Sequence, residues 1–169
     1  MPDQKQIPDE LKWRLAAGFV VKMPALYDRA FRQTAGKRFD GLEQEIWMEL
    51  ARHVAMAARD IHLPARNAQE IARTLVTMLG IIYGPEYKSE ALELNGDSAV
   101  IIVKRCPFLD EVPPAICTGE CLFHKCLALA LATVPLLNKD YAARYVRTMC
   151  TGDRQCEIKI AIDTGKDAR

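Results

Sequence analysis

Residues 87–105 read YKSEALELNGDSAVIIVKR, and this stretch decides the fold class. Asn95-Gly96 is the strongest short signal for a hairpin turn of two residues. The flanking segments, 87–94 and 98–105, are therefore predicted to be antiparallel strands. The run Val100-Ile101-Ile102-Val103 does not alternate between apolar and polar residues, which indicates a strand that is covered on both faces.

Upstream of this hairpin, the first 84 residues show helical spacing instead. Apolar residues repeat about every four positions in a first segment that Pro24 interrupts, and a second helix is predicted over about 25–34. A third helix, which Pro64 ends, has the clearest apolar stripe: Leu42, Ile46, Leu50, Val54, Ala57 and Ile61. A fourth is predicted over about 67–82. The N-terminal half is therefore predicted to be helical.

Downstream, a helix is predicted from about Thr118 to Val134, followed by a second hairpin of residues 143–150 and 156–162. Pairing Cys150 with Cys156 places Val146 on the apolar face and sets the two thiols side by side. The predicted fold class is α+β: a helical N-terminal half packs on a small antiparallel sheet of two hairpins, with a cysteine-bearing helix between them. We expect one domain over 1–169, with a helical part (1–84) and a sheet-and-helix part (85–165).

Composition excludes several classes of partner. The 169 residues carry a formal net charge of +1, so the basic excess of a nucleic-acid-binding protein is missing. The longest apolar run, 126–137, contains Pro135 and is too short to span a bilayer. The N-terminus is polar and does not resemble a secretory signal. We therefore expect a cytoplasmic protein that binds neither membrane nor nucleic acid. Separately, its apolar N-terminal helices could pair with those of a second copy.

The cysteines point to the candidate site. All six lie in the last third of the chain: Cys106, Cys117, Cys121, Cys126, Cys150 and Cys156. At about 100° per residue, Cys117, Cys121 and His124 share one stripe of a helix, whereas Cys126 points to the opposite face and is expected to fill the core. Cys106 ends a strand, and Cys150 or Cys156 lies at the hairpin turn.

Four thiols that converge suit an iron–sulfur cluster or a tetrahedral zinc. The predicted metal ligands are Cys106, Cys117, Cys121 and Cys156, with Cys150 and His124 as less favoured members. The first hypothesis is thus a binding or sensing protein that holds a cluster or other metal beside a small-ligand pocket between sheet and helices. A redox switch of Cys150 and Cys156, or plain burial of the cysteines without any cofactor, remains open.

Three stretches together resemble the L-2-amino-thiazoline-4-carboxylate hydrolase-like family: Arg105-Cys106-Pro107-Phe108-Leu109, then Cys117 and Cys121, then Gly152-Asp153-Arg154-Gln155-Cys156-Glu157-Ile158. The resemblance covers residues 86–162. That family is similar to the 4-vinyl reductase domains, small ligand-binding modules whose fold resembles subunits of the TRAPP transport complex. The resemblance implies that Cys106, Cys117, Cys121 and Cys156 are the expected cysteines, and that the ligand is small and hydrophobic or contains sulfur.

The same resemblance implies an enzyme as the alternative. It would be a hydrolase that opens a cyclic carbon–nitrogen bond of a thiazoline-type substrate. Cys117 or Cys121 would then be the nucleophile and His124 the base, because a cysteine needs a neighbouring base or a lowered pKa to attack.

Overall fold

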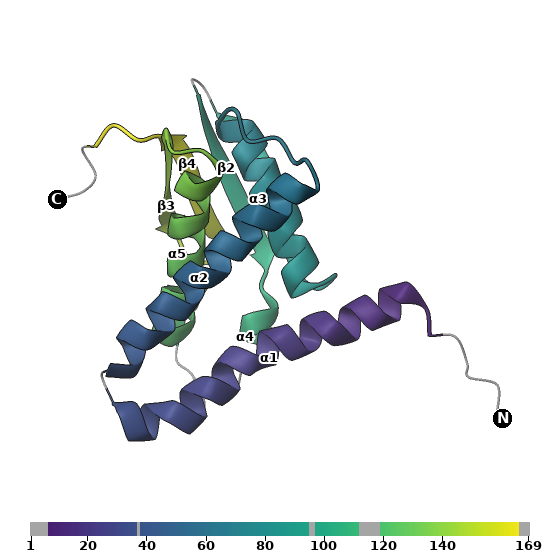
Figure 1. The fold of residues 1–169 in the computed structure, drawn as a ribbon, viewed down its shortest axis with the longest axis vertical. Helices are drawn as coiled ribbons and strands as arrows, with labels where there is room; N and C mark the ends of the chain where they lie inside the picture. Colours follow the sequence, from purple (N-terminus) through teal and green to yellow (C-terminus); the bar gives the residue numbers. More distant parts are fainter. Residues whose placement is uncertain (1–6, 37, 95–96, 112–118, 166–169) are drawn as a thin grey trace.

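The structure is a computed structural model that describes residues 7–36, 38–94, 97–111 and 119–165; for residue 111 and residues 119–124 it describes the backbone alone. The elements, in chain order, are α1 (Asp9–Ala35), α2 (Arg38–Asp60), α3 (Ala68–Tyr83), β1 (Lys88–Leu94), β2 (Ser98–Arg105), α4 (Pro107–Glu111), α5 (Gly119–Leu137), β3 (Tyr141–Arg147), the 3-10 turn η1 (Met149–Thr151) and β4 (Cys156–Ile162) (Figure 1). A helical N-terminal half and a small antiparallel sheet confirm the predicted α+β class.

The four strands form one sheet in the order β1-β2-β4-β3, with every neighbouring pair antiparallel. The first hairpin has its strands where the sequence predicts them, and Leu92 lies opposite Val100. The second hairpin also forms. Its strand β4 inserts beside β2, so both hairpins belong to the same sheet.

The predicted register of the second hairpin is wrong. Ile160 lies opposite Ala143 and not opposite Val146, and a bulge follows Tyr145. Cys150 lies in η1 outside the ladder, while Cys156 pairs with Val103 of β2. The turn explains the difference: η1 is closed by Gly152 at φ +106°, and the Asp153 carboxylate accepts a hydrogen bond of 2.9 Å from the Thr148 backbone N–H. A shift of three residues moves each side chain to the other face, and Val146 is exposed.

One face of the sheet is covered by α3 and α5, and α2 packs on the far side of α5 (Figure 1). Ala99, Ile101 and Val103 of β2 point into this interface and are buried. Val100 and Ile102 face the other way and are half-buried. The expectation that β2 is covered on both faces is therefore wrong. The cause is topological, because both helices that contact the strands return to the same side of the sheet.

A single helix, α1, replaces the two predicted before Gly36, and it runs through Pro24. Proline removes one backbone N–H and disfavours a helix interior. Here the cost is offset by packing, because Ala17, Val21 and Ala25 are buried along one face on both sides of the proline.

The apolar stripe predicted for the third helix faces the core only in part: Val54 is buried and Leu50 packs against the core, but Leu42, Ile46 and Ile61 are exposed. In α2 the buried face carries Trp47, Ala51, Val54 and Ala58, whereas Ile46 is 62% exposed. The outward face of α1 is also apolar, with Phe19 70% exposed. Other large apolar side chains exposed on these two helices are Leu11, Trp13, Leu15, Val20, Met23, Leu26, Tyr27, Phe31, Leu42, Met48 and Met56. Pairing with a second copy through these helices stays a prediction.

Ion pairs in a cluster of buried charges connect α1, α2 and α5. Lys125 of α5 is 2% exposed, and its Nζ lies 3.0 Å from Glu43 Oε1 of α2 and 3.9 Å from Asp28 Oδ1 of α1. Asp28 also pairs with Arg32, whose second nitrogen reaches Asp40 at 2.8 Å. Buried charges are tolerated in proteins only when paired in this way.

Helix α1 approaches the end of α3 closely at one point. Gly84, directly after α3, has φ +83°, and a Cβ there would lie 2.5 Å from the Cβ of Ala17. Only glycine fits both the left-handed backbone and the space.

The predicted cysteine-bearing helix is α5, and Pro135 lies inside its last turn and does not end it at Val134. Thr118, its predicted start, lies outside the described residues. Within the described part of the chain, no helix is both long and apolar enough to cross a bilayer.

Candidate functional site: a thiol-lined cavity

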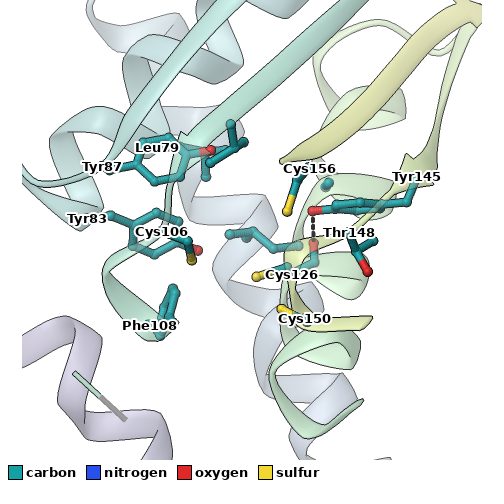
Figure 2. A pocket seen from close by; sticks show the side chains of 13 residues that line it. Leu79, Tyr83, Tyr87, Cys106, Phe108, Cys126, Tyr145, Thr148, Cys150 and Cys156 are labelled. Carbon is teal, nitrogen blue, oxygen red and sulfur yellow. Dashed lines mark hydrogen bonds between the residues drawn. The ribbon is translucent and has the colours of Figure 1, made fainter. Parts of the chain in front are cut away.

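A cavity lies between the sheet and the helices, where the sequence predicts a pocket (Figure 2). Its empty volume is about 520 Å³, part of which is open to solvent. The lining is almost entirely apolar or aromatic: Leu79, Tyr83, Tyr87, Val103, Cys106, Phe108, Cys126, Leu129, Ala130, Tyr145, Thr148, Cys150 and Cys156. The described lining contains no lysine, arginine, histidine or carboxylate.

Three helices build part of the walls. The end of α3 supplies Leu79 and Tyr83, four residues apart on one helical face. In α5, Cys126, Leu129 and Ala130 have the spacing i, i+3, i+4 and also share a face. Phe108 of the short helix α4 closes the space between them, with its ring 4.9 Å from Tyr83 and 6.4 Å from Trp47.

Four thiols from separate segments surround the cavity. Cys106 follows β2, Cys126 lies on α5, Cys150 on η1 and Cys156 on β4, and all four are free. Figure 2 shows their sulfur atoms arranged around the same space. The Cys156 sulfur accepts a hydrogen bond of 3.3 Å from the Met149 backbone N–H. Thiols distant in sequence therefore share one cavity.

The predicted metal ligands are only partly described. Cys106 and Cys156 line the same cavity, and so does Cys150. Cys117 lies outside the described residues, and for Cys121 and His124 only the backbone in α5 is described. Among the described side chains, no group of three or more histidines, cysteines or carboxylates is arranged to hold a metal ion. A metal centre of Cys106, Cys117, Cys121 and Cys156 stays a prediction.

Cys126 does not merely fill the core, as the sequence suggested, because its side chain lines the cavity. The sequence also gave no prediction for the three cavity tyrosines, Tyr83, Tyr87 and Tyr145. The spacing of Cys126, Leu129 and Ala130 at i, i+3 and i+4 could have indicated that these three residues share one helix face. No local pattern links Tyr145 to α3.

Burial sets the chemistry of the thiols. It raises the pKa of Cys106 to about 11 and that of Cys150 to about 12, and it raises the pKa values of Cys126 and Cys156 as well. The backbone N–H groups of Phe108 and Leu109 oppose this shift at Cys106 without cancelling it. All four described thiols are therefore neutral at physiological pH, so the cavity is both apolar and uncharged.

This protonation state predicts slow alkylation. At pH 8, Cys106 is expected to react with iodoacetamide about a hundredfold more slowly than a free thiol of pKa about 8.5, and its rate should rise about tenfold per pH unit up to pH 10. The cysteine thiols of the unfolded chain lose their protons above about pH 8.5, whereas the buried thiols of the folded protein keep them. The free energy of unfolding should therefore fall as the pH rises above about 8.5. Mass spectrometry of alkylated peptides measures the rates, with the urea-unfolded chain as control. Equal rates at pH 8 in folded and unfolded protein would contradict the prediction.

The fold and the cavity define a class, an α+β protein that encloses an apolar space lined by thiols. No protein-family model and no curated protein matches the sequence. Among solved structures, the chain is similar to subunit 3 of the trafficking protein particle complex from Naegleria fowleri, covalently bound to palmitic acid. The TM-score is 0.62 at 10% sequence identity, and the likeness covers 88% of this chain and 95% of that chain. At this identity the likeness shows the fold, and the resemblance to the hydrolase-like family stays a prediction.

Proposed function

We propose that the protein binds a small apolar molecule in the thiol-lined cavity. The observation that carries this proposal is the composition of the described walls, in which thirteen residues contribute no charged side chain. Ligand pockets are usually preformed concavities with an apolar lining and few polar groups. The raised pKa values of the thiols also support an apolar ligand, because neutral thiols behave as small hydrophobic groups.

An aliphatic ligand is favoured over a polar one. Burying an ion in an apolar site without a partner is costly, which disfavours charged ligands here. The structural neighbour from Naegleria fowleri is described as bound to palmitic acid, a molecule with a long aliphatic chain. That similarity supports an aliphatic ligand for this chain as a proposal, and the neighbour's covalent attachment is a property of that protein.

The proposal is tested by filling the cavity. Ala130 is 2% exposed and lines the cavity from α5, so Ala130→Phe should occupy ligand space and weaken binding of 2-heptanone at least about tenfold. Headspace gas chromatography measures the dissociation constant, and circular dichroism checks the fold. The matched control is Ala57→Phe at an exposed position of α2, which should bind like the wild type. Wild-type protein that does not bind 2-heptanone or longer neutral aliphatic molecules would refute the proposal.

We keep a metal centre as a second proposal, because thiols from several segments face one space. Its ligands would be Cys106, Cys117, Cys121 and Cys156, and iron–sulfur or zinc would suit them. Metal binding requires the thiolate form, so uptake should release protons from the ligand thiols, of which Cys106 and Cys156 are buried. Iron, sulfide and zinc contents of protein purified without oxygen test this directly, and protein without stoichiometric metal would contradict it.

The two remaining alternatives stay predictions. The hydrolase needs a thiolate at Cys117 or Cys121 and a base at His124, none of whose side chains is described. The redox switch needs Cys150 and Cys156 within bonding distance. They line the same cavity but are not cross-strand neighbours.

A further inference from the structure

One buried side-chain oxygen in the described cavity wall has no hydrogen-bond partner among the described residues. The hydroxyl of Tyr83 is buried and makes no hydrogen bond to any residue that the structure describes. The residue is 5% exposed and lines the cavity, and Figure 2 shows its side chain reaching into that space from α3. Buried polar groups in folded proteins are hydrogen-bonded in the great majority of cases, so an exception needs an explanation.

No other hydroxyl of the described wall is buried without a hydrogen-bond partner. Tyr87 is only partly buried and its hydroxyl is not left buried without a partner, and the Tyr145 hydroxyl donates to the Cys126 carbonyl oxygen at 3.2 Å. The Thr148 hydroxyl lies 2.7 Å from that of Thr151. Tyr83 therefore differs from Tyr87 and Tyr145, which line the same cavity but are only partly buried.

The ring of Tyr83 is held so that its hydroxyl cannot turn toward solvent. Its centroid lies 4.9 Å from that of Phe108 and 5.4 Å from that of Tyr87, with both pairs in edge-to-face geometry. Such contacts fix a buried ring and stabilise its orientation. Burial also keeps the phenol protonated by raising its pKa, so the hydroxyl remains a donor. The cavity thus presents one preorganised donor in an otherwise apolar wall.

We infer that Tyr83 is a binding subsite for one oxygen of the ligand, and that the ligand is a neutral apolar molecule carrying a carbonyl or similar acceptor. This rests on the proposed function and specifies its ligand class. A neutral acceptor fits because it satisfies the hydroxyl without bringing a charge into the cavity. A carboxylate fits less well, because no cationic side chain lies in the described wall to compensate it.

The test compares three ligands of equal length, 2-heptanone, heptane and heptanoate, on the wild type and on Tyr83→Phe. The substitution should weaken 2-heptanone about three- to tenfold, the range expected for one net hydrogen bond, and leave heptane binding unchanged or tighter. Heptanoate at pH 7.5 should bind the wild type more weakly than 2-heptanone. The melting temperature of unliganded Tyr83→Phe should not fall, because the lost hydroxyl has no partner there.

Tyr87→Phe is the matched control, since it removes a neighbouring cavity hydroxyl that is not buried without a partner. It should leave the ratio of ketone to alkane affinity unchanged. Equal losses for ketone and alkane in Tyr83→Phe, no loss for either, or tighter binding of heptanoate than of 2-heptanone would each overturn the inference while leaving apolar binding intact. Wild-type protein that binds neither ketone nor alkane would refute the proposed function, and the inference would fall with it.

Discussion

Replacing Lys125 with methionine is expected to lower the free energy of unfolding by about 3–5 kcal/mol, the cost of leaving buried charges without their partner. Lys125 is the cation between Glu43 of α2 and Asp28 of α1, and all three are buried. Asp28 keeps Arg32, but Glu43 would lose its 3.0 Å contact. Urea unfolding at neutral pH measures the loss.

The matched control is Lys104→Met. Lys104 pairs with Glu90 at 2.7 Å, but both side chains are about half exposed, and such surface pairs contribute about 1 kcal/mol or less. Burial already raises the pKa of Glu43, with Lys125 opposing the shift. Without Lys125 this pKa should rise further, so the deficit of the variant should shrink as Glu43 becomes protonated at lower pH. Equal losses in the two lysine variants would contradict the account of the cluster.

Gly84→Ala is expected to destabilise the fold by about 2–5 kcal/mol, the sum of backbone strain and overpacking. The residue has φ +83°, and its new Cβ would lie 2.5 Å from the Cβ of Ala17, a contact that requires α1 or the end of α3 to move. Thermal and urea unfolding measure the effect.

Gly80→Ala, inside α3, is the control. Its Cβ would meet no atom within 4 Å, so alanine should stabilise α3 by about 0.5–1 kcal/mol through helix propensity. If both substitutions shift stability in the same direction, the close approach between α1 and Gly84 is not significant.

The sequence predicted those parts of the fold in which local chemistry decides. Asn95-Gly96 located the first hairpin, and the apolar stripe of α3, with Ile71 and Leu75, faces the core as expected. It failed where contacts distant in sequence decide. Pro24 does not break α1, because packing on both sides of it holds the helix together. Part of the stripe of α2, including Ile46, points outward because α5 packs on the Trp47 side, with Lys125 reaching Glu43.

The sequence predicted the place of the candidate site, between sheet and helices, and part of its cysteines. Their clustering in the last third of the chain indicated a shared space, and Cys106 and Cys156 do line one cavity. Tyr83 was not predictable, because it ends a helix in the other half of the chain and nothing in its neighbourhood marks its hydroxyl as unsatisfied. That property emerges only when α3, α4 and α5 are packed together, and it is the feature that specifies the ligand.

Helix α1 lies against the chain beside the cavity at the point where Ala17 leaves no room for a Cβ on Gly84. Tyr83 lines the cavity directly before this glycine, and Tyr87 lines it three residues later. Helix α1 extends well past the other elements (Figure 1). Phe19 on this helix is exposed. A substitution or a partner that shifts α1 at Ala17 would therefore act on the residue next to Tyr83, whose hydroxyl has no hydrogen-bond partner among the described residues.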